Sequence, residues 1–321
     1  MNLPELLAPV ADDMHAVDTV IRARLDSEVV LIRTIGEYIV SGGGKRMRPA
    51  LVLMIANALG YQGSKHHLLA AVVEFIHTAT LLHDDVVDES DMRRGRSTAN
   101  AVFGNAASVL VGDYLYSRSF EMMVESDSMP VMSILSNATT VIAEGEVLQL
   151  LNVHDPDVSL ERYLQVVRYK TAKLFEAAAE VGAIIAGATP QQQTQAAAYG
   201  RHVGTAFQLV DDVLDYTGDA GELGKNVGDD LREGKPTMPL IRVMETGTPE
   251  QRQLIQDAIR TGEADFAAVA QAIQATDALE YTRQAARNEA ELARQALQDW
   301  PVSVYQKNLI EFCSFAVDRN H

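Results

Sequence analysis

Residues 75–88 read FIHTATLLHDDVVD, an apolar segment with helical spacing that ends in aspartates. The last eleven of these residues match TAFQLVDDVLD at residues 205–215 in seven of eleven positions, at an offset of 127. That offset is too long for a solenoid repeat. It suits two helices placed symmetrically about one cavity, each with its acidic end at the same opening.

Each segment carries an Asp-Asp-x-x-Asp cluster. On a helix, residues four positions apart lie about 40° apart around the axis, so the first and last aspartates of each cluster share a face and repel. Hard divalent cations with oxygen ligands compensate such repulsion, and magnesium commonly bridges carboxylates to phosphates. A solvated acidic helix end explains one cluster as well as a metal site does, but it explains two poorly. The predicted metal ligands are Asp84, Asp85, Asp88, Asp211, Asp212 and Asp215.

Basic residues gather beside both acidic clusters. Residues 41–49, SGGGKRMRP, place three glycines and three cations before an apolar helix, an arrangement that binds anions. Taken alone, such a loop is as often an ordinary turn, and Arg93-Arg94 could be a surface pair that balances Glu89 and Asp91. Because acids followed by bases recur, we predict a diphosphate clamped by magnesium on one side and by cations on the other. The further cations are Lys225 and Lys235.

The chain is predicted to be all-α and to form one domain over residues 1–321. Strand signals are scarce, since aromatic residues make up 6% and helix-forming residues recur at helical spacing. Breaks are expected around residues 41–44, 60–64, 95–97, 127–130, 155–159, 187–190, 218–224 and 234–236. They leave segments of roughly 15 to 30 residues. No stretch has the composition of a linker between domains.

Net charge and cysteine content exclude several classes of binding partner and metal site. The net charge of −17 gives no general attraction to nucleic acid or to an anionic membrane surface. No apolar run is long enough to span a bilayer, and the N-terminus lacks the features of a signal peptide. Cys313 is the only cysteine, so neither an internal disulfide nor a cysteine-based zinc site is expected. We expect a soluble, cytoplasmic protein without stable membrane insertion.

Five motifs occur in order: SGGGKRMRP, FIHTATLLHDDVVDESDMRRG, GEVLQL, FQLVDDVLD and GKNVGDDLREGKPT. Together they are very specific, and the chain resembles the trans-isoprenyl diphosphate synthases over about residues 30 to 240, most of all the bacterial octaprenyl group that serves quinone side-chain synthesis. The resemblance implies an isoprenoid-synthase helical bundle around a central cavity, and a homodimer. The implied activity is magnesium-dependent head-to-tail addition of isopentenyl diphosphate to an allylic diphosphate such as farnesyl diphosphate.

The resemblance also implies roles for individual residues. Asp84, Asp88 and Asp211 would be magnesium ligands, with the other three aspartates in support. Isopentenyl diphosphate would be bound by Lys45, Arg48, His77 and Arg94. The allylic diphosphate would be bound by Arg93, Lys170, Lys225 and Lys235, while Thr171 and Gln208 would turn oxygen atoms toward the developing carbocation. His77, Lys170, Thr171 and Gln208 carry no signal on their own.

The residues beneath Asp84 on its helix predict the product length. Thr80 and Ala79 lie one turn back and Ile76 another turn, and the bulky aromatic residues that close the cavity in the family's short-chain enzymes are missing here. A helical turn rises 5.4 Å, about one trans isoprene unit, so we predict a long product. Met123 is a candidate for the cavity floor, although core packing explains it at least as well.

Two other functions compete with this one. A terpene cyclase would share the first aspartate cluster but would normally replace the second with an Asn/Asp, Ser, Glu metal motif, which residues 211–215 do not fit. A non-catalytic subunit of a two-chain prenyl synthase typically loses aspartates or the basic loop. Both features are intact in this chain.

Overall fold

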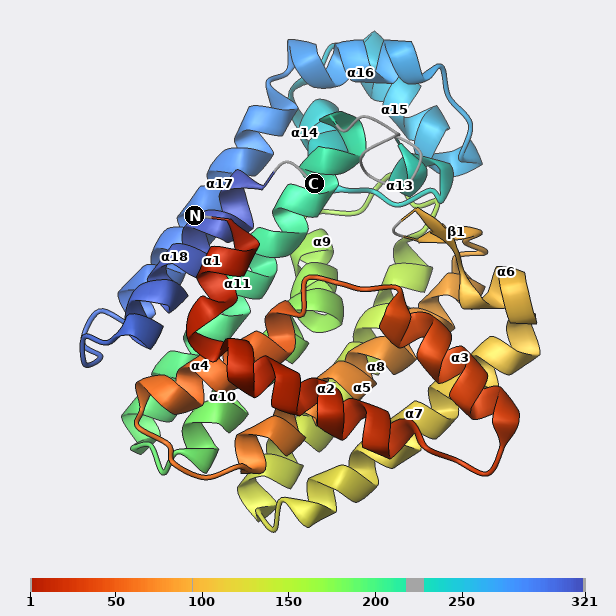
Figure 1. Ribbon diagram of the computed structural model, residues 1–321. Helices are drawn as coiled ribbons and strands as arrows, with labels where there is room; N and C mark the ends of the chain where they lie inside the picture. The colour runs from red at the N-terminus through yellow and green to blue at the C-terminus, as the bar shows by residue number, and fades with distance from the viewer. Residues whose placement is uncertain (1, 94, 218–227, 320–321) are drawn as a thin grey trace.

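The computed structural model describes residues 2–93, 95–217 and 228–319, and helices dominate it (Figure 1). The first half contains α1 (Leu3–Leu7), the 3-10 helix η1 (Ala8–Val10), α2 (Ala11–Leu25), α3 (Val30–Ser41), α4 (Met47–Ala58), α5 (Lys65–Val87), α6 (Ala99–Phe103), α7 (Asn105–Glu125) and α8 (Met129–Asn152). Two short strands, β1 (Met92–Arg93) and β2 (Arg96–Ser97), pair antiparallel between α5 and α6. The all-α prediction is confirmed.

The second half begins with a continuous helical stretch and ends with a long helical pair. Its elements are α9 (Leu160–Val166), the π-helix η2 (Val167–Ala172), α10 (Lys173–Ile185), α11 (Pro190–Thr217), α13 (Asp229–Arg232), α14 (Met238–Thr246), α15 (Pro249–Thr261), α16 (Phe266–Ala275), α17 (Ala278–Ala296) and α18 (Val304–Asp318). None of the helices among the described residues is both long and apolar enough to span a membrane.

Local sequence explains where many helices begin. Ser128 accepts a hydrogen bond from the Val131 N–H at the start of α8, and Ser159 does the same for the Arg162 N–H at the start of α9. Thr248 forms a capping box with Gln251 at the start of α15. These side chains satisfy backbone donors that a helix leaves open at its first turn. The predicted breaks within the described residues fall between helices, and the break at residues 95–97 lies in the short hairpin. The break predicted at residues 218–224 lies outside the described residues.

The main hydrophobic core lies among α4, α5, α7, α8, α10, α11 and α18. α5 packs on α4 and α7, while α11 packs on α10 and α17. In Figure 1, α2 and α3 cross the front of this layer, and α2 contacts α5. Two smaller clusters adjoin α14, one with α15 and α16 and one with α9 and α17. The arrangement holds α5 and α11 inside the molecule, with their C-terminal ends around one opening.

Candidate active site

The acidic ends of α5 and α11 open into one deep cleft. Asp84 and the capping residue Asp88 come from α5, and Asp211 and Asp215 come from the end of α11; all four line a cleft of ≈ 770 Å³. The C-terminal end of a helix carries partial negative charge, so the carboxylates repel both one another and the helix ends. The cleft therefore attracts cations, as the spacing of the aspartates predicts.

The structure brings most of the predicted site residues to this cleft. Those that line it are Lys45, Arg48, His77, Thr80, Asp84, Asp88, Arg93, Lys170, Thr171, Gln208, Asp211, Asp212, Asp215 and Lys235. Asp85 is buried and bonded to Arg93. Ala79, Ile76 and Met123 are fully buried in the main core. Arg94 and Lys225 lie outside the described residues.

Two lysines hold the first aspartate cluster. Lys170 Nζ lies 2.7 Å from Asp84 Oδ1 and 2.7 Å from Glu146 Oε2, and Lys235 Nζ lies 2.8 Å from Asp88 Oδ2. Burial lowers the pKa of Lys170, but the carboxylates of Asp84 and Glu146 raise it more, and the net shift is upward. The pKa of Lys235 is raised for the same reason, chiefly by Asp88. Both lysines are therefore charged at the mouth of the cleft.

A short hairpin positions Arg93. It follows α5 directly, and Arg93 Nε donates to Asp85 Oδ1 at 2.7 Å, while Arg93 Nη2 lies 2.6 Å from the same oxygen. Asp85 is 4% exposed, so its carboxylate is shielded from water, while the Arg93 side chain is partly exposed. The second aspartate of the first cluster thus anchors a cation that lines the cleft, and it lies behind Asp84 and Asp88.

The second cluster has a hydrogen-bonded network behind it. Gln208 Nε2 donates to Asp212 Oδ1 at 2.9 Å, the Tyr163 hydroxyl donates to Asp212 Oδ2, and Thr171 Oγ1 donates to Gln208 Oε1 at 2.9 Å. Burial, and then the charge of Asp230, raise the pKa of Asp212 to about 8. Asp212 therefore orients its neighbours, whereas Asp211 and Asp215 are only partly buried.

A π-helical turn presents Lys170 and Thr171. The segment η2 lies between α9 and α10, and such turns hold one residue more than an α-helical turn. α8 comes unusually close to it at Gly145, where an added Cβ would lie 2.6 Å from the Lys170 backbone nitrogen. Only glycine fits this approach. The GEVLQL motif contains this glycine, but helical periodicity gives no sign of a π turn.

The basic loop before α4 ends in a tight cap. Arg46 takes a left-handed conformation with φ of 47° and pairs with Glu74 at 3.3 Å. Arg48 lies over the Phe175 ring at 4.3 Å from its centroid, with Nη1 3.2 Å from His77 Nε2. Stacking fixes the guanidinium plane. Two of the residues predicted for one diphosphate, Arg48 and His77, are therefore in direct contact.

Sequence reasoning missed several cleft residues. Arg319 reaches back from the C-terminus, where Nη2 donates to Asp211 Oδ1 at 2.6 Å and the guanidinium lies 3.6 Å from the Phe207 ring centroid. No local pattern marks a residue 108 positions from its partner. Glu146 could have been predicted, because it lies in the GEVLQL motif. Burial, and then the charge of the neighbouring Asp84, raise the pKa of Glu146 to about 7.

The donor set fits a hard divalent cation. Asp84, Asp88, Asp211 and Asp215 supply only carboxylate oxygens, which are the preferred ligands of magnesium and calcium. Three of these carboxylates are paired with Lys170, Lys235 and Arg319, so the cleft already balances negative charge with positive charge. A metal ion held by the carboxylates and the neighbouring basic side chains could bind the same anion from two sides.

Comparison with known proteins agrees with this geometry. Residues 29–276 match the polyprenyl synthetase family model. The chain is 54% identical to octaprenyl diphosphate synthase from Escherichia coli (strain K12), over 100% of both chains. It is similar to the crystal structure of a polyprenyl synthase from Caulobacter crescentus CB15 complexed with calcium and isoprenyl diphosphate, at a TM-score of 0.96 and 42% identity over 100% of this chain and 98% of that one. A decaprenyl diphosphate synthase from Rhodobacter capsulatus gives a TM-score of 0.94 at 45% identity over 100% of both chains. On this evidence the chain belongs to the polyprenyl synthetase family.

Proposed function

We propose that this protein is a trans-polyprenyl diphosphate synthase that adds isopentenyl diphosphate units head-to-tail to an allylic diphosphate, with farnesyl diphosphate as the primer. The full-length identity to octaprenyl diphosphate synthases, 54% and 50% in two relatives, supports a long all-trans product. We infer that this product is octaprenyl diphosphate and that it serves quinone side chains. The observation that best supports this reaction is the cleft in which two aspartate clusters face each other.

Magnesium is the cofactor that we propose for the acidic end of the cleft. Asp84, Asp88 and Asp211 would hold it, with Asp215 beside them and with Asp85 and Asp212 behind. When bound, magnesium neutralises the diphosphate leaving group. The oxygen-only donor set supports this choice, as does the calcium in the related Caulobacter crescentus structure.

We propose that the allylic diphosphate lies between the two clusters. Arg93, Lys170 and Lys235 would bind its oxygens, together with Lys225. Lys170 and Lys235 are charged and already point to Asp84 and Asp88, so they are placed to meet an anion bound there. Breaking the allylic C–O bond moves the electron pair onto the diphosphate, and these cations stabilise the charge that develops.

The other substrate is proposed to bind at the basic loop. Lys45, Arg48 and His77 would hold isopentenyl diphosphate, with Arg94. The contact between Arg48 and His77 supports a shared ligand. The alkene then attacks the allylic cation, a C–C bond forms, and the released diphosphate takes the proton that is lost.

Thr171 and Gln208 are proposed to face the carbocation. Their hydrogen bond fixes both side chains, and Gln208 is held further by Asp212. Each has an oxygen atom that carries partial negative charge, and such an oxygen stabilises a cation that develops beside it. A mostly neutral pocket protects the intermediate from water.

Small side chains beneath Asp84 are proposed to admit the growing chain. Thr80 lines the cleft, and its hydroxyl donates to the His77 carbonyl at 2.8 Å, so it is already satisfied within α5. Ala79, Ile76 and Met123 lie deeper, in the hydrophobic core. We propose that this apolar region accepts the chain as it lengthens. An Ala79→Tyr variant tests the proposal, since it should shorten the products.

Incubation of the purified protein with magnesium, farnesyl diphosphate and labelled isopentenyl diphosphate tests the function. We expect labelled polyprenols longer than geranylgeraniol after dephosphorylation and chromatography. Asp84→Ala should abolish elongation, while Asp257→Ala, an exposed position on α15, should leave it unchanged. Elongation that survives in Asp84→Ala would contradict the mechanism. Products that stop at geranylgeranyl would contradict only the chain length.

We also propose a homodimer in the cytoplasm. Exposed large hydrophobic side chains concentrate on α7 and α8, including Leu110 at 66% and Leu151 at 67% exposed. A second copy of the chain would cover such a surface. Light scattering should give twice the chain mass, and Leu110→Glu with Leu151→Glu should reduce it. Leu292→Glu, on α17, is the matched control.

The proposed location in the cytoplasm rests on the cysteine content. The single cysteine, Cys313, is buried and is compatible with a reducing compartment.

A further inference from the structure

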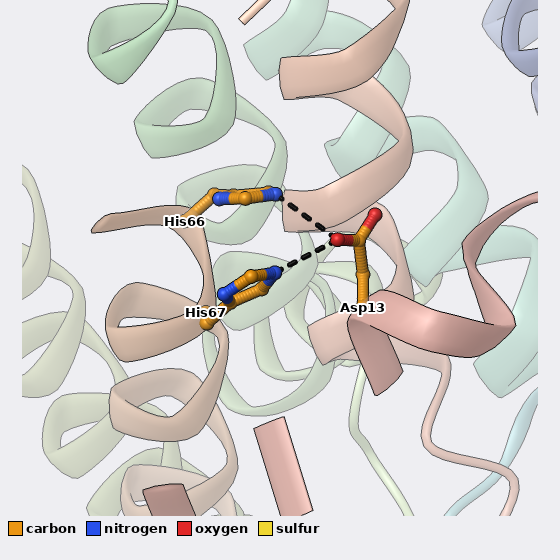
Figure 2. A group of neighbouring side chains, drawn as sticks. All are labelled: Asp13, His66 and His67. Carbon is orange, nitrogen blue, oxygen red and sulfur yellow. Dashed lines mark hydrogen bonds and ion pairs between the residues drawn. The ribbon is translucent and has the colours of Figure 1, made fainter. Parts of the chain in front are cut away.

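A second cluster of metal-binding side chains lies far from the cleft. It consists of Asp13 in the first turn of α2 and of His66 and His67 in the first turn of α5 (Figure 2). His67 Nε2 lies 2.8 Å from Asp13 Oδ1, and His66 Nε2 lies 3.5 Å from the same oxygen. One ligand atom from each residue falls within 4.8 Å of the others. Figure 2 shows both rings directing a nitrogen toward one carboxylate oxygen.

The carboxylate is held in place from behind. Asn57 Nδ2, at the end of α4, donates to Asp13 Oδ2 at 2.8 Å. That bond occupies one oxygen and leaves the other facing the imidazoles. Metal-binding side chains in proteins are usually oriented by such an outer hydrogen bond. Burial raises the pKa of Asp13, but hydrogen bonds from His67 and Asn57 lower it more, so the group is ionised at neutral pH.

The imidazole of His66 is suited to coordination. Its side chain is 5% exposed, and burial together with the neighbouring His67 ring lowers the pKa of His66. A position in the first turn of a helix also disfavours a positive charge, since that end carries partial positive charge. Both effects favour the neutral imidazole, which is the form that binds metal ions.

The distances agree with a four-coordinate ion. Metal–ligand bonds of about 2.05 Å at tetrahedral angles place ligand atoms about 3.3 Å apart. The two nitrogen–oxygen distances, 2.8 Å for His67 and 3.5 Å for His66, lie on either side of that value. Two imidazoles and one carboxylate suit zinc and its first-row neighbours, whereas magnesium prefers oxygen ligands.

We propose that Asp13, His66 and His67 form a zinc-binding site at which a water molecule completes the coordination. Asp13 and His67 are each partly exposed, with side chains 26% and 20% accessible, so an ion can reach the site from solvent. The site joins the start of α2 to the start of α5. His66 and Asp84 stand 18 residues apart on α5, about 27 Å along a helix, so the site is separate from the catalytic cleft.

Zinc titration of the full-length protein in excess magnesium tests the proposal, because magnesium fills the oxygen-lined cleft. We expect one zinc ion per chain with a dissociation constant below the micromolar range, measured against a chromophoric chelator. Asp13→Ala and His67→Ala should each weaken binding about 100-fold, and Asn57→Ala about 10-fold. Cobalt in place of zinc should give the intense visible absorption of a four-coordinate ion.

The chain supplies close controls. Asp12→Ala and His15→Ala change exposed residues of the same kinds on α2 and should bind zinc like the unaltered protein. His67→Gln keeps the size of the side chain and separates loss of a ligand from loss of packing. Zinc should raise the melting temperature of the two controls but not that of Asp13→Ala or His67→Gln. Equal zinc binding by all variants, or no zinc bound by the unaltered protein, would overturn the proposal.

Discussion

At the scale of single residues, the cleft is a balance between like-charged carboxylates and the cations that hold them. Burial raises the pKa of Asp84, but Lys170, together with Lys235 and Arg93, lowers it more, so the net shift is downward and the group stays ionised. Lys170 is shared between Asp84 and Glu146 at equal distances of 2.7 Å. One ammonium group thus links the first aspartate cluster to α8.

We expect Lys170→Met to lower kcat by about 10²- to 10³-fold, because it removes one preorganised charge at the position proposed for the leaving diphosphate. Steady-state kinetics with saturating magnesium measure this. Lys173→Met is the matched control: Lys173 lies three positions further along and pairs with Glu176 at 2.7 Å. Comparable activity in the two variants would contradict a role for Lys170 in binding the allylic diphosphate.

Glu146 predicts a pH dependence of stability. Its pKa is raised to about 7 in the folded chain, above the value of 4.5 for a free carboxyl. The folded state therefore holds more protons between these values, and its stability falls as pH rises from about 4.5 to 7. Glu146→Gln removes this loss, so the variant should gain stability relative to the unaltered protein between pH 5 and pH 8.

Urea unfolding in the presence of a chelator, at several pH values, measures the Glu146 effect. Glu144→Gln, an exposed position on the same helix, should leave the pH dependence unchanged. A difference between Glu146→Gln and the unaltered protein that stays constant with pH would contradict the prediction.

At the scale of elements, α5 and α11 carry the acidic clusters at their C-terminal ends, and α5 also carries polar side chains of interest at its N-terminal end. α5 carries aspartates at its C-terminal end and the paired histidines at its N-terminal end. α11 carries the second acidic cluster and packs along α10 and α17. Between them, α8 presses against η2 through Gly145. The position of Lys170 in the cleft thus depends on how closely two helices approach.

Gly145→Ala should disturb that approach. The added methyl group would lie 2.6 Å from the Lys170 backbone nitrogen, so α8 or η2 has to move. We expect a loss of about 1–3 kcal/mol in unfolding free energy. Elongation activity should fall even under conditions in which the variant is fully folded, because Lys170 and Thr171 shift with η2. Glu144→Ala, on the exposed face of α8, should change neither quantity.

At the scale of the whole molecule, one helix joins the hydrophobic clusters. α11 contributes Tyr199 to the main core, Leu209 to the cluster with α9 and α17, and Tyr216 to the cluster with α15 and α16. A cluster cannot be lost without exposing part of the same helix. We therefore propose that residues 1–321 form a single cooperative domain.

Calorimetry should accordingly show one unfolding transition for the whole chain. Cys313 provides an independent reporter, because burial raises its pKa to about 12 and the thiol is inaccessible. Alkylation at pH 8 should follow the global unfolding curve in urea. Alkylation that precedes the loss of helical signal would show that α18 opens separately, and would contradict a single unit.

Many residues of this site could be predicted from the sequence, because they belong to short motifs whose spacing is visible there. Asp84 and Asp88 are one helical turn apart, and Lys45 and Arg48 stand in a glycine-rich loop, so spacing alone predicts ligand types. Arg319 and the pairing of Asp13 with His66 could not be found in this way, because tertiary packing brings them to their partners. The π turn at η2 was not predicted because the hydrophobic periodicity of one segment does not distinguish a π turn from an α-helical turn.

The π turn at η2 should allow one residue to be deleted without loss of the fold. Such a turn holds one residue more than the α-helix that would otherwise run unbroken from α9 into α10. Deleting a single codon there should restore a regular helix, which keeps the flanking helices and the fold. Within the turn, side chains such as Lys170 and Thr171 would change direction relative to the cleft by up to about 100°, the rotation that one residue makes around an α-helix. A deletion scan across residues 167–172 should therefore yield folded proteins that no longer elongate a prenyl chain, a separation of fold from catalysis that few substitutions would achieve.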